Sequence, residues 1–471
     1  MKEFKHILAA TAALTLAFSI TACSDKKQDT SSSYVDKVTV DITKASDIAN
    51  IQDGAKKEIT YLGEADLNPT DAAQEKSTEL TLFESKGGKI LYKPTTHDAR
   101  FDDLATHTLS GDIDIFKYEW LAYPSQIVKD IYQPIDELAD FDSSLWSGVK
   151  TTAEQFALGG KHYVAPLTFE ASAYIFYDKD TLTANGLDDP QNLWVENKWT
   201  WDTFESMMKT YIGNATGDEI RYGINGFFKP HLVQQTGKTM VSYDQATNQF
   251  ANNIGDPNIE RAENLLYEMS KSELILNGWY GSAQECFDAN CLFYAMGSWA
   301  ATGDFGPKDD DEWGVVPMPK DPNHTDLNIT TSNMTAYMWV KGSTAKEAVK
   351  TWYECCRVSA TSQDYKQTNQ DKFFASNPNW TQNDYDIFQS ILGDDYTMLT
   401  DYGYGISAAL GDPKQFDGNQ CLIDALYGDV TVIQDDGSQD TWTKVRDTYS
   451  SVVDSSVSQL NTELKAYGGN K

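Results

Sequence analysis

Strand-like and helix-like segments alternate early in the chain, and this alternation restricts the fold more than any other sequence feature. Apolar and β-branched runs at 57–62, 89–93 and 112–116 are typical of short strands, and residues 72–86 have a helical pattern. Strands separated by helices at this spacing predict an α/β domain with a largely parallel sheet. Because 471 residues are too many for one simple core, we expect two domains.

Two amphipathic helices stand out later in the chain. Residues 199–211 place Trp201, Phe204, Met208 and Tyr211 on one face, which is the pattern of a helix packed on a core. A second and longer helix is predicted near the C-terminus by a stripe with the same period: Trp442, Val445, Tyr449, Val452, Val453, Val457, Leu460 and Leu464. We find no internal repeat.

The N-terminus has the layout of a secretory signal. Lys2 and Lys5 precede an uncharged apolar run at 7–20, which is shorter than the ~20 residues of a membrane span. The run ends in the sequence ITAC at Cys23, which resembles the lipobox of bacterial lipoproteins. An ordinary secretory signal followed by a chance cysteine is the alternative.

The lipobox resemblance implies a lipid anchor. Residues 1–22 would be removed, and the acylated Cys23 would hold the protein on the outer face of the cytoplasmic membrane. The segment after Cys23 is rich in Ser, Asp, Lys and Gln and cannot bury much apolar surface. We therefore expect residues 23–56 to form a tether.

Composition excludes several classes of partner and site. The formal charge of −32 disfavours nucleic acid and anionic lipid as partners. No CxxC pair is present and the six histidines are scattered, so we expect no metal site and no cofactor. The acidic loop 434–440 lacks the spacing of a calcium-binding EF-hand.

Five cysteines follow Cys23, and an odd number cannot all pair within one chain. Cys286 and Cys291 are close enough in sequence to bridge a short loop. We expect free buried thiols, so that the apolar core has to stabilise the fold.

Several segments, in order along the chain, form a distinctive series. They are SGDIDIFKYEW at 110–120, GKHYVAPLTFEASAYIFYDKDTLTANGL at 160–187, WTWDTFESMM at 199–208, CLFYAMGSWA at 291–300, WGVVPMPKDPN at 313–323 and AKEAVKTWYECC at 345–356. This series resembles extracellular solute-binding proteins of ABC transporters, in the family that contains maltose-binding protein. The segment at 160–187 is the most specific, because in that family a proline-containing strand there crosses from one lobe to the other.

The resemblance implies a two-lobed α/β fold of the periplasmic-binding-protein type, with a hinge and a ligand cleft between the lobes. Residues 57–167 with 320–400 would form the N-terminal lobe, and 168–319 with 401–471 the C-terminal lobe. Ligand would stabilise the closed state because it contacts both lobes only there. The implied partners are a small ligand and a membrane permease, and we expect a monomer.

The candidate cleft segments combine carboxylates with aromatic rings. Aromatic faces stack on the apolar faces of sugars, and carboxylates fix sugar hydroxyls, so the resemblance favours a sugar or oligosaccharide. The candidate ligand-binding residues are Glu64, Asp66, Tyr118, Glu119, Trp120, Glu170, Trp299, Asp304, Tyr402 and Tyr404.

Each candidate also has a structural interpretation. Trp120, Trp299, Tyr402 and Tyr404 are equally the residue types that fill a core, and Glu170 is a potential surface carboxylate. A core tryptophan and a stacking tryptophan differ in the effect of truncation, because the first stabilises the fold and the second binds ligand.

Two other classes remain open from the sequence. A cell-surface glycoside hydrolase would need two carboxylates across a sugar ring, and the number of acidic residues does not exclude it. No Ser/His/Asp elbow or HExxH motif is present. A sensor or adhesion lipoprotein could use the same fold without a permease.

Overall fold

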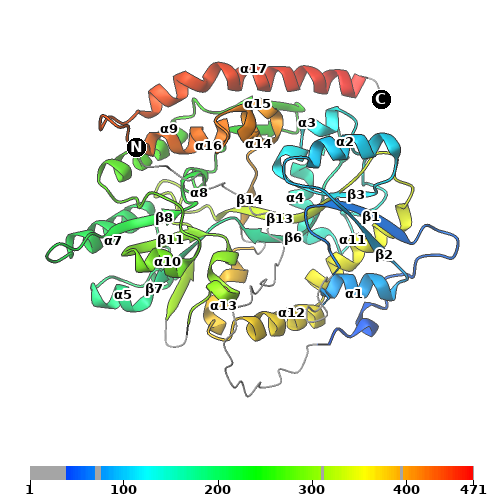
Figure 1. Ribbon diagram of the computed structural model, residues 1–471, viewed down its shortest axis with the longest axis horizontal. Helices are drawn as coiled ribbons and strands as arrows, with labels where there is room; N and C mark the ends of the chain where they lie inside the picture. Colours follow the sequence, from blue (N-terminus) through cyan, green and yellow to red (C-terminus); the bar gives the residue numbers. More distant parts are fainter. Residues whose placement is uncertain (1–38, 69–75, 309–311, 393–395, 470–471) are drawn as a thin grey trace, which may run out of the picture.

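The computed structural model describes residues 39–68, 76–308, 312–392 and 396–469. These residues form two lobes, each built on its own β-sheet, with strands and helices passing between them (Figure 1). The predicted signal segment 1–22 and the predicted lipidation site Cys23 lie outside the described residues.

The sheet of the first lobe has six strands, in the order β14-β13-β3-β1-β2, with β6 also paired to β13. β1 pairs in parallel with both β2 and β3, which confirms the predicted parallel arrangement. β13 is antiparallel to β3 and β6 and parallel to β14. The strands are β1 Glu58–Gly63, β2 Lys89–Pro94, β3 Ile115–Lys117, β6 Ala165–Ala171, β13 Ile329–Trp339 and β14 Thr397–Leu399.

The sheet of the second lobe has four strands, in the order β12-β7-β11-β8. β8 and β11 are parallel, so both end at the same edge of the sheet, whereas β7 is antiparallel to β11 and β12. The strands are β7 Tyr174–Asp178, β8 Tyr222–Gly226, β11 Cys291–Met296 and β12 Trp313–Val316. Two short pairs lie elsewhere: β4 Ala157–Leu158 with β5 Lys161–His162, and β9 Val241–Asp244 with β10 Gln249–Asn252.

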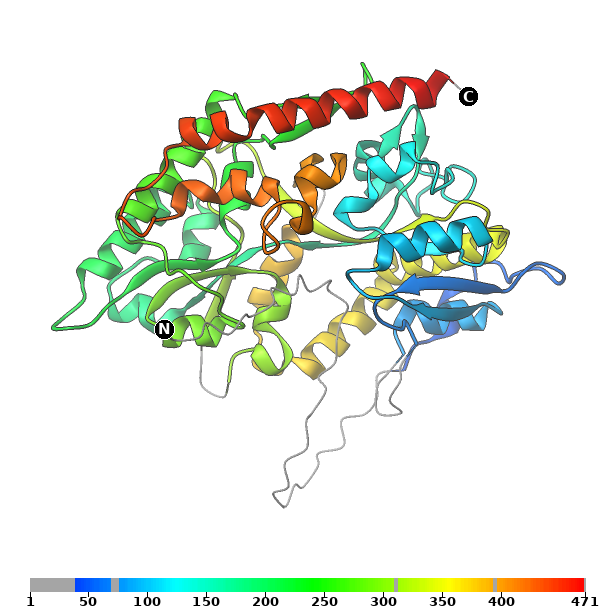
Figure 2. The same cartoon turned by 45° about the horizontal axis from the view of Figure 1, so that its top comes forward.

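The chain first crosses between the lobes from β6 to β7. Pro166 lies opposite Ala336 in the first sheet, and β7 begins in the second sheet only three residues after β6 ends. Ser172, in the short connection, donates its backbone N–H to Thr331 O at 2.8 Å. The turned view shows β6 and β13 running side by side from one lobe towards the other (Figure 2). The predicted proline-containing crossing strand is therefore present.

Helices of the first lobe cover its sheet. Ser77 caps α1, where its side chain accepts a hydrogen bond from Leu80 N, and Phe83 of α1 packs edge-on against Trp352 of α11 at 5.4 Å between ring centroids. The described helices of this lobe are α1 Thr78–Ser85, α2 Arg100–Ser110, α3 Ser125–Val128, α4 Lys150–Gln155 and α11 Lys346–Thr361, with the 3-10 turns η1 Ile42–Ala45, η2 Trp120–Ala122 and η3 Ser147–Val149.

The predicted amphipathic helix at 199–211 is α7, Trp201–Gly213, and its buried face carries the aromatic and methionine residues that the sequence indicated. Apart from α11, the other described helices between β7 and residue 390 are α5 Lys179–Ala184, α6 Pro190–Val195, α8 Lys229–Gln234, α9 Pro257–Lys271, α10 Ala283–Asp288, α12 Gln363–Ser376 and α13 Gln382–Ser390, with the 3-10 turns η4 Ser298–Ala301 and η5 Gly303–Phe305.

The C-terminal helices lie across both lobes. α17, Trp442–Gly469, packs against α3 on one side and against α9 and β10 on the other, and both views show it spanning the molecule (Figures 1 and 2). Its predicted stripe is buried except at Tyr449, which is partly buried, and Val452, which is 36% exposed. The segment before it contains α14 Gly403–Ile406, α15 Ala408–Gly411, α16 Leu422–Gly428, η6 Pro413–Gln415 and η7 Asp429–Thr431.

Two parts of the expected domain division need correction. Within the expected tether 23–56, Ala45, Ile48 and Ile51 are buried in the core of the first lobe, because these apolar residues cover that core beside α1. In the segment 320–400, assigned to the first lobe, α13 packs against β12 of the second sheet instead. Its Phe388 stacks on Tyr174 at 4.7 Å between ring centroids.

The cysteines of the described chain are buried free thiols, as expected: Cys286, Cys291, Cys355, Cys356 and Cys421. Cys286 and Cys291 both direct their sulfur towards Phe293 O, at 3.9 and 3.3 Å. Burial raises the pKa of the Cys355 thiol to about 12, so this thiol stays protonated near neutral pH.

Candidate ligand-binding site

The carboxyl ends of β1, β2 and β3 bring charged side chains to one edge of the first sheet. Parallel strands end at the same edge, so Glu64 after β1, His97 after β2 and Glu119 after β3 are neighbours. Glu64 Oε1 lies 3.3 Å from His97 Nδ1. The single Nε–H of Arg100 is shared between the two carboxylate oxygens of Glu119, at 2.6 and 2.7 Å. Both predicted carboxylates are therefore held by basic partners of their own lobe.

Lys117, the last residue of β3, lies among these carboxylates. Burial lowers the pKa of Lys117, and the charges of Glu170, Glu119 and Glu64 oppose that shift. Charge interactions weaken with distance, so the effect of Glu170 on the Lys117 pKa indicates that Glu170, on the crossing strand β6, lies near the same edge.

Glu170 connects this edge to the second lobe. Ser298, in the turn directly after β11, donates its hydroxyl to Glu170 Oε1. Burial raises the pKa of Glu170 to about 7, and the Ser298 backbone and the Lys117 charge oppose that shift. The predicted Glu170 thus lies at the junction of the lobes rather than on an open surface.

A cavity lies beside this junction, where β13 and β14 meet η2, α4 and α8. Aromatic rings form much of its wall, and the polar lining groups are hydroxyls, a histidine, an amide and one carboxylate. The aromatic lining residues are Tyr118, Trp120, Phe156, Phe227 and Tyr404, and the polar ones are Thr152, Ser172, His231, Gln234, Thr331, Thr400 and Asp401.

Trp120 and Tyr404, both predicted site residues, form one wall of the cavity, with 4.6 Å between their ring centroids. Gly405 makes this pairing possible. A Cβ at Gly405 would lie 1.7 Å from Tyr123 O and 2.4 Å from Trp120 O. A larger residue would push α14 away from η2, so the glycine positions Tyr404 against Trp120.

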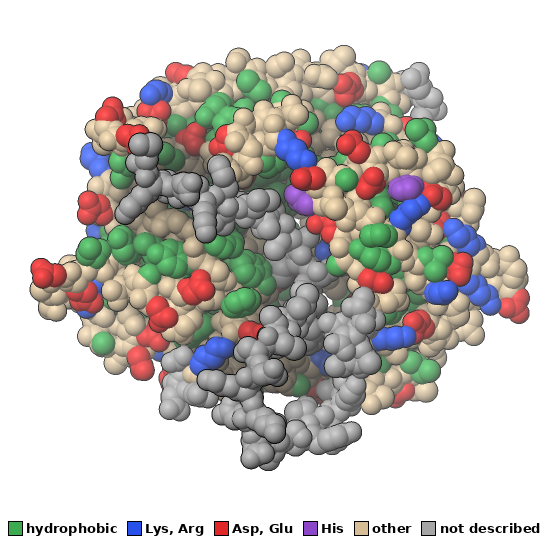
Figure 3. Space-filling model, viewed as in Figure 1, with side chains coloured by type: hydrophobic (Ala, Val, Ile, Leu, Met, Phe, Trp, Pro, Cys, Tyr) green, Lys and Arg blue, Asp and Glu red, His purple; other side chains and the backbone are tan. Residues whose placement is uncertain are grey.

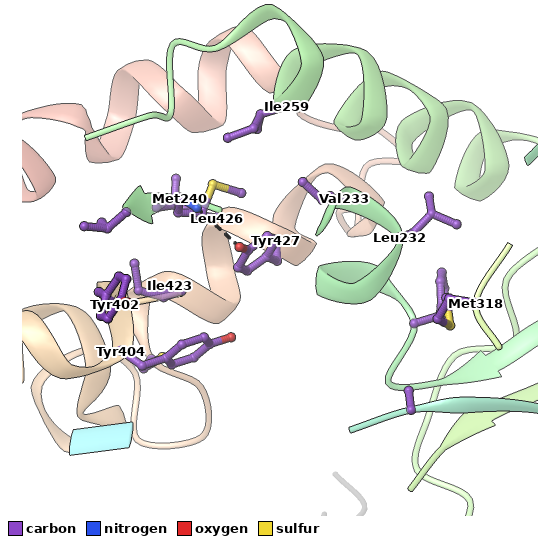
Figure 4. Close-up of a cluster of buried hydrophobic side chains, with 14 of the residues drawn as sticks. Leu232, Val233, Met240, Ile259, Met318, Tyr402, Tyr404, Ile423, Leu426 and Tyr427 are labelled. Atoms are coloured by element: carbon purple, nitrogen blue, oxygen red, sulfur yellow. Dashed lines mark hydrogen bonds between the residues drawn. The ribbon is translucent and has the colours of Figure 1, made fainter. Parts of the chain in front are cut away.

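The carboxylate of Asp401 accepts its hydrogen bonds from groups within the protein. It accepts hydrogen bonds from the backbone N–H of Met240, Val241 and Gly403 at 2.9–3.1 Å, and from Tyr427 OH at 2.5 Å. Figure 4 shows Tyr427 next to Met240 in a cluster of buried hydrophobic side chains. Hence the groups that the described lining offers to a ligand are neutral ones.

Trp299 belongs to a pair of tryptophans on the second lobe. It follows Ser298, is partly buried against the second core, and stacks on Trp279 with 6.1 Å between ring centroids and 16° between ring planes. Trp279 is 68% exposed. Trp299 is therefore neither a fully buried core residue nor a free ring, and one face of the pair is open to solvent.

The remaining predicted residues lie elsewhere. Tyr402 is 7% exposed and donates its hydroxyl to Gln155 O at 2.7 Å, so it contributes to the core and to a shallow depression beside Tyr243 rather than to the cavity. Asp304 is an exposed residue of η5, and the carboxylate of Asp66 accepts hydrogen bonds from Asn68.

Sequence reasoning missed the second-lobe side of the cavity. Phe227, His231 and Gln234 follow β8, and the signal that points to them is Gly226 at the strand end. Gly226 has a φ of +100°, and a Cβ there would lie 2.1 Å from Ala295 O. Such a glycine marks a sharp turn at the carboxyl end of a strand, which is where α/β folds bind ligands.

Within the described ranges, no group of three or more His, Cys, Asp and Glu side chains is arranged to hold a metal ion. The described part of the chain also has no helix with the length and apolar character needed to span a membrane.

No protein-family model and no curated protein matches the chain. Solved structures do match it. The ABC substrate-binding protein Lmo0181 from Listeria monocytogenes, in complex with cycloalternan, is 16% identical with a TM-score of 0.56, and the match covers 87% of this chain and 99% of that one. UspC of M. tuberculosis is 16% identical with a TM-score of 0.57, covering 86% and 100%.

The galacto-N-biose-/lacto-N-biose I-binding protein of an ABC transporter from Bifidobacterium longum is 14% identical with a TM-score of 0.55, and the match covers 88% of this chain and 99% of that one. Nearly the whole of each of these proteins therefore aligns with this chain. The chain has the two-lobed α/β fold of ABC-transporter substrate-binding proteins, which confirms the fold class that the sequence predicted.

Proposed function

We propose that the protein is the solute-binding component of an ABC importer and binds an uncharged sugar or oligosaccharide between its lobes. The observation that carries this proposal is the cavity at the lobe junction, whose wall combines aromatic rings with neutral hydrogen-bonding groups. Aromatic faces bind the apolar faces of sugar rings, and hydroxyl, amide and imidazole groups match sugar hydroxyls.

The charge distribution supports an uncharged ligand over an ionic one. Arg100 is already bonded to Glu119, and Asp401 is already bonded to three backbone amides and a tyrosine. An amino acid or an organic anion would need an available counter-charge in the cavity, because burying an unpaired charge is costly.

Closure of the lobes is the proposed means by which ligand binding is signalled to a membrane permease. The cavity has walls from both lobes, so a ligand gains its full set of contacts only when the lobes approach each other. Small-angle scattering with and without saturating sugar should show compaction, and an unchanged lobe separation at saturation would contradict this mechanism.

In this proposal the protein is located on the outer face of the membrane, where a lipid on Cys23 holds it, and it acts as a monomer. This part rests on the ITAC sequence and on the polar segment that follows it. Replacing Cys23 by Ser should release the protein to the medium or leave it unprocessed. Unchanged partitioning into detergent would contradict the anchor.

The test of the binding function is a thermal-shift and calorimetric screen with glucose, galactose, maltotetraose, lacto-N-biose and cycloalternan. A sugar that binds the folded state raises the melting temperature by mass action, and proline and glutamate serve as control ligands of other chemistry. Incubation of the same sugars with the protein also tests for hydrolysis. Shortened products would favour a glycoside hydrolase, and a larger shift with an amino acid would contradict sugar binding.

A further inference from the structure

Helix α12 connects the two lobes at a second place, away from the crossing strands. It follows α11 of the first lobe after the single residue Ser362, and it leads to α13, which packs against β12 of the second sheet. Figure 1 shows α12 between α1 of the first lobe and α13, on the side of the molecule opposite α17. The helix therefore has one end near each lobe.

The N-terminal end of α12 is held by the first lobe. Tyr365 is 1% exposed in the core of that lobe, and its hydroxyl donates to Asp41 O at 2.7 Å. One turn further on, Asn369 Oδ1 accepts a hydrogen bond from Thr78 Oγ1 at 2.9 Å. Asp41 caps η1 and Thr78 begins α1, so these bonds join α12 to two separate elements of the first lobe.

The C-terminal end of α12 is held by the second lobe. Phe373 lies 5.2 Å from Trp380 and 4.9 Å from Tyr385 between ring centroids, and it packs against the buried cluster that contains residues of β7 and β11. Directly after the helix, Asn377 Oδ1 accepts a hydrogen bond from Gly303 N of η5 at 2.7 Å. This end is therefore attached to a turn that follows β11 as well as to the core.

Between these two anchored ends, α12 is polar. Residues 366–372 read KQTNQDK, and each of their side chains is exposed or only partly buried. Gln367 Nε2 donates to Asp371 Oδ1 at 2.8 Å, a bond between successive turns of an exposed helix. A helix that is polar on all sides is typical of one that bridges two domains through solvent. The middle of α12 thus belongs to neither core.

We infer that α12 is a strap that limits how far the two lobes can separate. An α-helix cannot lengthen without breaking its backbone hydrogen bonds, so Tyr365 and Phe373 stay about 12 Å apart along an intact α12. The lobes can then move further apart on this side only if one end of the helix leaves its contacts. Rotation remains possible at Ser362, where the backbone between α11 and α12 is extended.

The test breaks α12 in its polar middle. Asp371→Pro removes a backbone N–H from the helix interior and clashes with the preceding turn, and the Asp371 side chain bonds only within α12. The matched control is Lys209→Pro in α7, a helix of the second lobe, because Lys209 is also exposed and also pairs with a residue one turn away, Glu205. Small-angle scattering of the ligand-free proteins measures the radius of gyration, and circular dichroism shows that each variant is folded.

We expect Asp371→Pro to raise the radius of gyration by about 1 Å, compared with roughly 22 Å for a compact chain of this size. We expect Lys209→Pro to leave it at the wild-type value, because α7 does not join the lobes. Should either proline variant fail to fold, Gln367→Gly/Asp371→Gly and Glu205→Gly/Lys209→Gly loosen the same two helices more mildly and should give the same order.

A folded Asp371→Pro or Gln367→Gly/Asp371→Gly variant with the wild-type radius of gyration would overturn the inference. An equal increase in the α12 and α7 variants would also overturn it, because it would reflect general loosening of the fold. A decrease in the α12 variants would show that the helix holds the lobes apart instead. These measurements need no sugar, so their outcome is independent of the proposed function.

Discussion

The two lobes present different chemistry to the space between them. The first-lobe edge carries polar groups that contact each other, namely the ion pair of Arg100 with Glu119 and the contact of His97 with Glu64. The second-lobe side presents rings and neutral polar groups, including Phe227, His231 and the Trp279–Trp299 pair. In the space-filling view, acidic, basic and histidine side chains border the middle of the molecule on the right, and hydrophobic ones border it on the left (Figure 3).

This difference suggests a division of roles. Charges that satisfy each other stabilise their own lobe and offer little to an uncharged ligand, whereas exposed rings and neutral polar groups can contact one. On this view the first-lobe edge is a preformed surface, and the second-lobe side moves onto the sugar when the lobes close. The following predictions test that division.

Arg100→Ala should have the largest effect, and on stability. It would leave the Glu119 carboxylate, 29% exposed on the side chain, without its partner, at a cost of about 3 kcal/mol in the free energy of unfolding. Urea denaturation measures this. Arg446→Ala is the matched control, because its partners Asp447 and Glu260 are 64% and 44% exposed, and it should cost less than about 1 kcal/mol. Similar losses in the free energy of unfolding for both variants would show that the Arg100–Glu119 pair stabilises the fold no more than a surface pair does.

Trp279→Ala should act on binding instead. Because its ring is 68% exposed, truncation should leave the melting temperature nearly unchanged, while sugar affinity falls by about 1–3 kcal/mol if the ring pair stacks on the ligand. Leu109→Ala, at 92% exposure on α2, is the control for removal of an exposed apolar side chain. Trp299→Ala should lower both affinity and stability, because Trp299 is partly buried. Unaltered sugar affinity in both tryptophan variants would show that neither Trp279 nor Trp299 contacts the sugar.

Glu170→Gln should change how stability depends on pH. The folded-state pKa of Glu170 is raised to about 7, so the folded protein binds its proton more tightly than the unfolded chain does. The resulting stabilisation is fully present below the unfolded pKa and is lost as the pH rises through about 7.

The stability of wild type relative to Glu170→Gln should therefore fall by about 1–2 kcal/mol from pH 5 to pH 8, after allowance for partial exposure. Denaturation at both pH values measures it, with Asp304→Asn as a surface control. A difference that is constant with pH would show that Glu170 is solvated normally and that the junction is more open than the structure indicates.

The sequence predicted the parts of the fold that depend on local pattern. The parallel strands β1 to β3 and the helices α7 and α17 followed from apolar periodicity, and the crossing near Pro166 followed from a family resemblance. The packing of α13 on the second sheet was not predictable, because a helical pattern does not specify which of two sheets its apolar face will cover.

Part of the candidate site could be proposed from the sequence. Glu64, Glu119 and Glu170 were candidates because carboxylates after strands are conspicuous in a sequence, and Trp299 was a candidate through the family resemblance. His231 and Gln234 were not candidates, since their place in the cavity wall depends on the surrounding fold. Tyr402 and Tyr404 show the same limit: two tyrosines in one DYGYG motif point to different places, and the sequence treats them alike.

The last prediction separates these two tyrosines. Tyr402→Phe removes the hydrogen bond to Gln155 O and should cost about 1 kcal/mol of stability, with sugar affinity changed less than about twofold. Tyr404→Phe removes the hydrogen bond to Asp424 Oδ1, at a similar cost in stability, and keeps the ring that pairs with Trp120 in the cavity wall. Tyr404→Ala removes that ring as well. Its sugar affinity should fall well below that of Tyr404→Phe, whereas Tyr402→Phe should bind as wild type does. If Tyr402→Phe instead weakens binding more than Tyr404→Ala, the ligand occupies the depression beside Tyr243, and the assignment of the cavity as the binding site is wrong.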